Sequence, residues 1–125
     1  MALTKDFRET VKERADRDPE FRKGLLTEAM EAVVRGELDT AKILLRDYIN
    51  ATDGFETVGK AVEKSPKSIM RMLSRDGNPN AKNLFDVTQF LQKNAGIRFR
   101  VVSDETKSSQ KTKPKKQVKK RRESA

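Results

Sequence analysis

The sequence contains no cysteine and no histidine. The thiol nucleophile, the imidazole general base and the ordinary zinc-ligand sets are therefore all missing. The chain also lacks a paired nucleophile and base and a glycine-rich phosphate-binding loop. We therefore expect a protein that is not an enzyme and that binds no metal ion or cofactor. The lack of cysteine also fits a reducing cytosol.

Long apolar runs are absent as well. The first residues, Met1–Asp6, have no apolar core of the kind found in signal peptides. No apolar run approaches the ~18–20 residues that are needed to cross a bilayer. We expect a soluble, cytoplasmic protein that does not span a membrane.

Basic side chains are abundant and unevenly distributed. The chain of 125 residues carries a formal charge of +9. Residues 1–40 hold eight basic and ten acidic side chains, residues 54–102 hold nine and four, and residues 103–125 hold nine and three. This balance favours a polyanionic partner, with nucleic acid ahead of an anionic membrane surface.

Capping signals and apolar periodicity predict a series of short helices. Asp18 followed by Pro19 is a helix start, because Asp accepts hydrogen bonds from free amide groups and Pro lacks the N–H that would be unpaired there. Gly36 is a natural end for that helix. Apolar residues repeat at helical spacing through most of the chain. The segments that we expect to be helical are 4–16, 18–35, 38–52, 55–62, 66–73 and 80–94.

The C-terminal region combines two patterns. Residues 97–102 alternate apolar and basic side chains, which is typical of a β-strand. Because one strand is unstable alone in water, we expect a dimerisation strand that pairs with a second subunit through Ile97, Phe99 and Val101. Residues 103–125 have almost no apolar side chains, so we expect a disordered Lys-rich tail. The expected organisation is an N-terminal helical extension (1–36), a helical domain with its C-terminal strand (37–102) and the tail (103–125).

Residues 55–74 meet the requirements of a helix-turn-helix. The first helix must bury an apolar face, and Val58 and Val62 stand four residues apart. Gly59 supplies the small residue that lets two helices approach closely. The second helix has a capped start at Ser65–Pro66 and a buried face that includes Ile69. We therefore predict that residues 37–102 form a DNA-binding domain.

The second helix of such a motif lies in the major groove of DNA. Lys67 and Arg71 stand four residues apart on its outward face, and their long donors suit guanine edges, so we expect them to read bases. Other polar residues would contact the DNA backbone and fix the register, Ser65 in addition to its role as a cap. These residues are Ser65, Ser68, Arg75, Asn78 and Lys82.

A resemblance to a known family rests on four segments, Leu45–Thr52, Lys67–Arg75, Gly77–Pro79 and Asn83–Leu84. From residue 7 to about residue 102 the chain resembles the Cro-like (XRE-type) antidote proteins of bacterial addiction modules, the HigA-like antitoxins. The resemblance implies a Cro/lambda-repressor-like five-helix domain. It also implies a homodimeric repressor that binds a palindromic operator in double-stranded DNA. It further implies neutralisation of a RelE/HigB-like toxin, a ribonuclease that cleaves mRNA.

Two features depart from that family pattern. Glu63 occupies the turn position at which Cro-like motifs commonly have Gly, so the turn must tolerate a side chain or take another shape. The Lys-rich tail is not part of the family pattern, and its role is open.

Other functions stay open on the sequence alone. A stand-alone helix-turn-helix regulator without a toxin partner would have the same sequence features. A protein-interaction scaffold could use its basic tail for non-specific attraction to nucleic acid, with a steep dependence on salt. An RNA-binding protein is less favoured, because Tyr48 is the only Tyr and the Phe residues are expected in the core, which leaves no stacking surface for bases.

Overall fold

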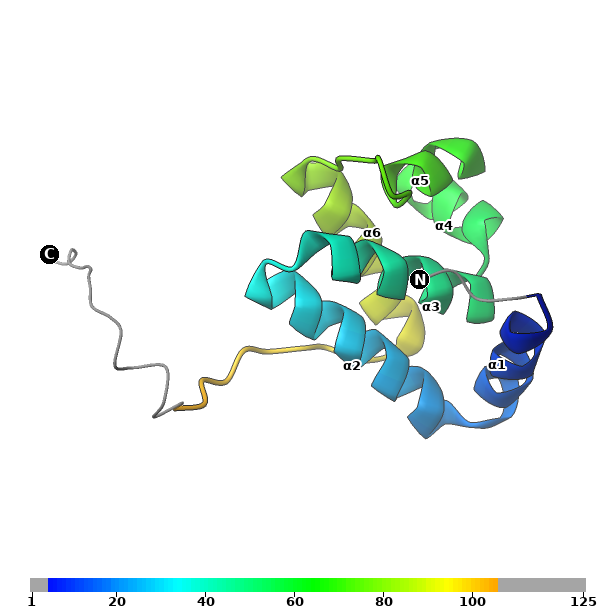
Figure 1. Ribbon diagram of the computed structural model, residues 1–125, viewed down its shortest axis with the longest axis horizontal. Helices are drawn as coiled ribbons and strands as arrows, with labels where there is room; N and C mark the ends of the chain where they lie inside the picture. The colour runs from blue at the N-terminus through cyan, green and yellow to red at the C-terminus, as the bar shows by residue number, and fades with distance from the viewer. Residues whose placement is uncertain (1–4, 106–125) are drawn as a thin grey trace, which may run out of the picture.

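The computed structural model describes residues 5–105, with side chains from Thr10 onward. Helices make up most of this range (Figure 1), and the predicted mainly α fold is confirmed. No helix within it is long and apolar enough to traverse a bilayer. The helices are α1 (Lys5–Arg17), α2 (Pro19–Arg35), α3 (Leu38–Ala51), α4 (Phe55–Val62), α5 (Pro66–Met72) and α6 (Ala81–Ala95).

The helix boundaries follow the capping residues. The carboxylate of Asp18 accepts a hydrogen bond from the amide of Phe21 at 3.2 Å, so it caps α2 as the sequence predicts. The side chain of Asn80 caps α6 in the same way. Helices α2 and α6 end at Gly36 and Gly96, which both adopt the left-handed conformation that glycine reaches without steric cost.

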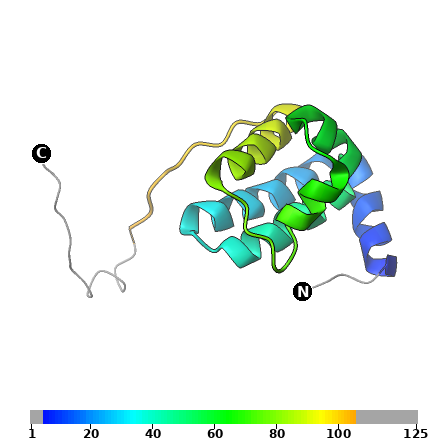
Figure 2. The ribbon, with the colours of Figure 1, turned by 90° about the horizontal axis from the view of Figure 1, so that it is seen from above.

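A single hydrophobic core joins α2 to the helix-turn-helix segment. Helix α3 packs against α1, α2 and α4, while α4 packs against α5 and α6 (Figures 1 and 2). Helix α2 therefore shares its core with the helices that follow it. The buried core residues are Leu26 and Ala29 of α2, Leu45, Tyr48 and Ile49 of α3, Val58 of α4, Ile69 of α5 with Leu73 after it, and Val87 and Leu91 of α6.

The segment after α6 is extended and unpaired. Residues 97–105 leave the helical body as an irregular trace, and the described residues contain no β-strand (Figures 1 and 2). A strand needs a neighbour to supply its ladder of hydrogen bonds, and residues 5–105 contain no such neighbour. Pairing with a second copy therefore stays a prediction. Most of the predicted tail, residues 106–125, lies outside the described residues.

Glu63 forms the turn between α4 and α5 in the conformation that glycine favours. Its backbone has φ 61° and ψ 46°, the left-handed region, and it is the only residue other than glycine with positive φ in the described chain. Gly59 lies under this turn, where a Cβ atom would stand 2.5 Å from the carbonyl oxygen of Lys64. The turn thus accommodates the side chain at position 63 in a left-handed conformation, and it packs directly on the backbone of α4.

The left-handed turn predicts that Glu63→Gly stabilises the protein. A residue with a Cβ atom destabilises the folded state by about 1–2 kcal/mol in this conformation. Replacement by glycine removes this cost, but glycine also increases the entropy of the unfolded chain, which offsets part of the stabilisation. We expect a net increase of about 0.5–1 kcal/mol in the free energy of unfolding, measured by urea titration. Glu63→Ala is the control, since it keeps the Cβ atom. An equal gain in both variants would place the cost in the carboxylate instead of the backbone.

Candidate nucleic-acid interface

Helix α5 has one face in the core and one face in solvent. Ile69 is fully buried, as is Leu73 directly after the helix. Lys67 and Arg71 are exposed on the opposite face. The hydroxyl oxygen of Ser65 accepts a hydrogen bond from the amide of Ser68 at 3.0 Å, which confirms the predicted cap. A seven-residue helix is too short to be stable alone, so this packing and capping determine its position.

A hollow lies between α5 and the beginning of α6, and we call it the α5–α6 hollow. It brings together three of the predicted contact residues, Ser68, Arg71 and Asn78. Ser68 is half-buried at its wall, whereas Arg71 and Asn78 are exposed at its edge. The residues that line the hollow are Lys64, Ser68, Arg71, Met72, Asp76, Gly77, Asn78, Pro79, Asn80 and Asn83.

The other predicted contact residues lie around this hollow but not in it. Lys67 and Arg75 are exposed. Ser65 lines a separate depression beside the turn after α4. Lys82 lines another one with Glu63, and its ammonium group donates to the carboxylate of Asp86 at 2.9 Å. This hydrogen bond raises the pKa of Lys82, so the side chain is a cation with a neighbouring anion, still 80% exposed.

Besides the helix cap Asn80, three polar lining residues of the hollow were not assigned a role in DNA contact from the sequence. Lys64 adds a second cation beside Arg71, while Asn83 adds an amide at the first turn of α6. Asp76 places an acidic side chain among these donors. Asn83 belongs to one of the segments that carry the family resemblance, which was a usable signal. For Lys64 and Asp76, the sequence contained no indication of a binding role beyond their positions next to Ser65 and Gly77.

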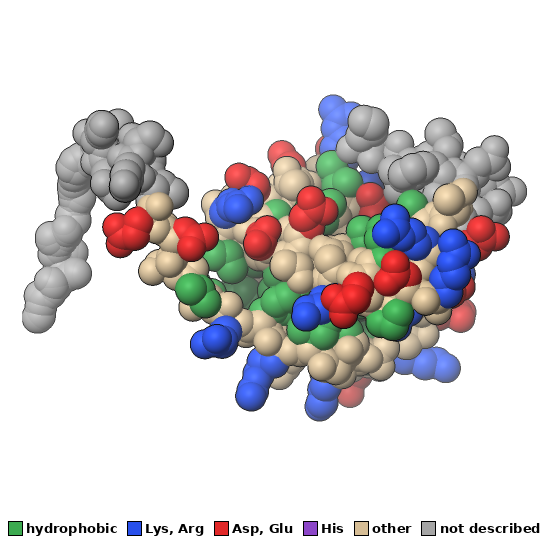
Figure 3. All heavy atoms as spheres, turned by 90° about the horizontal axis from the view of Figure 1, so that it is seen from below, with side chains coloured by type: hydrophobic (Ala, Val, Ile, Leu, Met, Phe, Trp, Pro, Cys, Tyr) green, Lys and Arg blue, Asp and Glu red, His purple; other side chains and the backbone are tan. Residues whose placement is uncertain are grey.

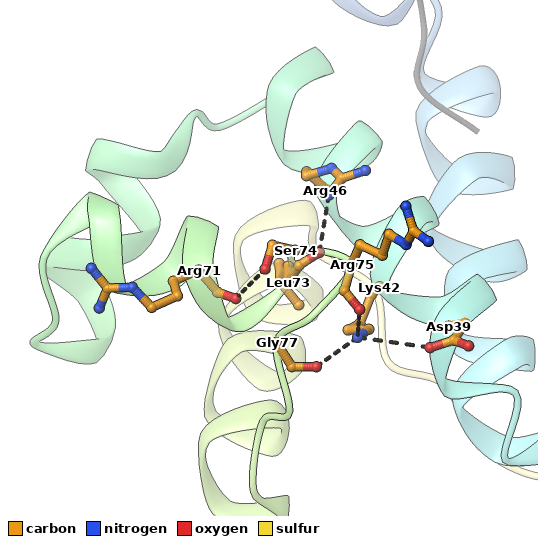
Figure 4. A network of polar contacts seen from close by, with 8 residues as sticks. All are labelled: Asp39, Lys42, Arg46, Arg71, Leu73, Ser74, Arg75 and Gly77. Atoms are coloured by element: carbon orange, nitrogen blue, oxygen red, sulfur yellow. Dashed lines mark hydrogen bonds and ion pairs between the residues drawn. The ribbon is translucent and has the colours of Figure 1, made fainter.

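A buried lysine of α3 fixes the backbone that follows α5 (Figure 4). Lys42 is only 3% exposed, and its Nζ atom donates to the carbonyl oxygens of Arg75 at 3.1 Å and Gly77 at 2.6 Å. Asp39 stands 3.7 Å from the same nitrogen but is itself exposed, so solvent screens this ion pair. The hydrogen bonds to the two carbonyl groups therefore offset the desolvation cost of burying the ammonium group.

Arg46 and Gly77 complete this attachment. One turn after Lys42 on α3, the guanidinium group of Arg46 donates to the carbonyl oxygen of Leu73 at 3.2 Å. A Cβ atom at Gly77 would overlap the carbonyl oxygens of Arg71 and Met72, so only glycine lets the chain pass so close to the end of α5. The side chain of Arg71 points away from this network (Figure 4). The end of α5 is held from inside, and its outward side chains stay available.

The residues predicted to form a dimer interface divide between core and surface. Phe99 packs against the protein's own core, and its amide donates to the side-chain oxygen of Gln92 at 3.1 Å. Ile97 is half-buried, while Val101 is 76% exposed. Val101 and Val102 line a hollow with Val34 of α2, and Figure 3 shows hydrophobic side chains gathered where the C-terminal segment leaves the body.

The described residues contain no cluster of acidic, His or Cys side chains that could hold a metal ion. Comparisons with protein-family models, with curated proteins and with solved structures find no match to this chain.

The contacts of Lys42 predict a measurable loss of stability in Lys42→Met. Methionine has a similar length but leaves the carbonyl groups of Arg75 and Gly77 without their donor. We expect the free energy of unfolding, measured by urea titration, to fall by about 1–3 kcal/mol. Lys23→Met, at an exposed position of α2, is the matched control and should change it by less than about 0.5 kcal/mol. Equal stability of the two variants would show that the carbonyl contacts contribute nothing.

Proposed function

We propose that this protein is a sequence-specific DNA-binding repressor that acts as a homodimer and reads DNA through α5. The observation that carries the proposal is the orientation of α5, which buries Ile69 and exposes Lys67 and Arg71. An exposed short helix with a basic outer face, supported from behind by α4, has the form that a helix-turn-helix needs to enter a major groove. Exposed cations alone would be ordinary surface residues.

In the proposed complex, Arg71 and Lys67 contact base edges and the surrounding polar groups contact phosphates. Guanidinium groups suit the two acceptors of a guanine edge. Ser68 and Asn78 lie beside Arg71 in the α5–α6 hollow, where they would fix the register on the DNA backbone. Ser65, Arg75 and Lys82 flank this surface and would add phosphate contacts.

Dimerisation would place two copies of α5 in successive major grooves, about 34 Å apart on a palindromic operator. The exposed Val34, Val101 and Val102 support an interface at the C-terminal segment, because large apolar side chains in water favour a partner. Charges of both signs, Glu31 and Arg100, line the same hollow and would pair across the two-fold axis of a homodimer. Phe99 would support this segment from the core side.

Antitoxin activity is the second part of the proposal, and it is supported by the family resemblance and by charge. The first 40 residues carry a net acidic charge that would complement a basic RelE/HigB-like ribonuclease. Glu20 and Glu28 are exposed on α2 outside the C-terminal hollow and are available for such contact. A stand-alone repressor without this partner is the alternative within the same fold.

Substitution of Arg71 tests the reading of DNA. Fluorescence anisotropy with DNA from upstream of the gene should give at least ~10³-fold tighter binding than scrambled DNA. Arg71→Ala should weaken operator binding by about 1–3 kcal/mol and scrambled DNA much less. Lys82→Ala is the comparison, since loss of a phosphate contact weakens both DNAs equally. A chain that ends at residue 105 removes the contribution of the basic tail. Equal binding of the wild type to both DNAs would exclude a specific repressor.

Charge reversal on α2 tests the toxin partner. Deletion of residues 1–36 is unsuitable, because it removes Leu26 and Ala29 from the core. Glu20→Lys combined with Glu28→Lys keeps the core and the C-terminal hollow, and it should reduce neutralisation of a co-expressed RelE/HigB-like toxin, measured as growth rescue. Lys23→Glu on the same helix is the control. Full rescue by the double variant would remove the acidic face of α2 from the proposed toxin site.

A further inference from the structure

One large apolar side chain is exposed on α5. Met70 is 46% exposed and lies three residues after Lys67 and directly before Arg71. With 3.6 residues per turn, Arg71 lies opposite the buried Ile69 and Leu73, and Lys67 is its neighbour on that face. Met70 lies beside Lys67, at the border between the basic face and the buried face. Single exposed apolar side chains are common on protein surfaces, so exposure alone assigns Met70 no role. Its place on α5, beside the two cations that the proposed function brings to base edges, is the observation that carries the inference.

We propose that Met70 recognises the C5-methyl group of a thymine in the operator half-site. This inference rests on the proposed function and adds a preference for one base. Among the base edges of the major groove, thymine presents a methyl group, and apolar side chains contact it. The thioether chain of methionine is flexible and polarizable, which suits a contact with a single methyl group.

The position of Met70 also limits where the thymine lies. Met70 and Arg71 are consecutive, and consecutive residues rise by about 1.5 Å along a helix axis. A base pair occupies about 3.4 Å of the DNA axis. The thymine therefore lies within about two base pairs of the base that Arg71 contacts, in the same half-site.

A protein-docking role fits the surroundings of Met70 less well. The apolar centre of a protein interface is depleted of Lys and charged residues. Met70 instead has Lys67 beside it on the helix and Arg71 next to it in the sequence, and both are exposed. The exposed valines of the C-terminal hollow line a different surface, with residues of α2 and α6 and none of α5.

The test removes single methyl groups from the DNA. The full chain first selects its preferred sequence from a randomised duplex pool, and each thymine of the selected duplex is then replaced by deoxyuridine. We expect one position in each half-site to weaken binding about fourfold in anisotropy titrations, the effect of one buried methyl group. Met70→Ala should weaken binding to the thymine duplex by a similar factor and should be insensitive to the same replacement.

Phe85→Ala provides the matched control. Phe85 is 58% exposed on α6, so this variant also loses an exposed apolar side chain, and it should keep the wild-type sensitivity to deoxyuridine. Retained sensitivity in Met70→Ala, or no sensitive thymine in the wild type, would overturn the role of Met70 and leave the repressor intact. Equal loss of binding to selected and scrambled DNA in Met70→Ala would also overturn it. If the pool yields no enriched sequence, the proposed function itself fails and the thymine contact fails with it.

Discussion

The burial of one ammonium group is the constraint on which the geometry of α5 depends. The Nζ atom of Lys42 is buried, and the backbone after α5 offers it two acceptors, the carbonyl groups of Arg75 and Gly77. A lysine in that position stabilises one arrangement of the loop and penalises any other, since displacement of the loop would leave a buried charge without partners. An apolar residue would pack as well but would not select one loop position.

Close backbone contacts also fix α5 at its N-terminal end and directly after its C-terminal end. Gly59 brings the turn at Glu63 against α4, and Gly77 brings the chain against the last carbonyl groups of α5. A short helix would be mobile if it were held only by its two buried side chains. Because backbone contacts hold both ends of the helix, the side chains of Lys67, Met70 and Arg71 are not needed to hold α5 in place. The proposed DNA-reading surface requires such a rigidly held helix with accessible side chains.

The helix boundaries could be predicted because their signals are local. Asp18, Asn80 and Gly96 each act on the next or the preceding turn, and the structure has helix ends at all three. The burial of Lys42 could not be predicted, because lysine is almost always exposed and its partners are 33 and 35 residues away. The alternation of residues 97–102 indicated a strand, but it could not show that Phe99 turns inward to the protein's own core. The lining of the α5–α6 hollow could be predicted only in part. Ser68, Arg71 and Asn78 were predicted from the helix-turn-helix motif, whereas the other lining residues depend on how α6 packs.

Under the proposed function, affinity and specificity for DNA would have separate sources in this chain. The α5 surface belongs to residues 54–102, with nine basic and four acidic side chains, whereas residues 106–125 have nine basic and one acidic. The C-terminal segment leaves the body on the side away from α5 (Figures 1 and 2). Attraction to phosphates scales with the number of charges engaged and does not depend on the DNA sequence. Discrimination between DNA sequences needs short-range contact with base edges. A change in the C-terminal charges should therefore alter binding to operator and random DNA by the same factor. A change on α5 should alter the ratio of operator binding to random-DNA binding. This ratio, measured at constant salt, therefore identifies the surface that reads the sequence, whereas the salt dependence does not.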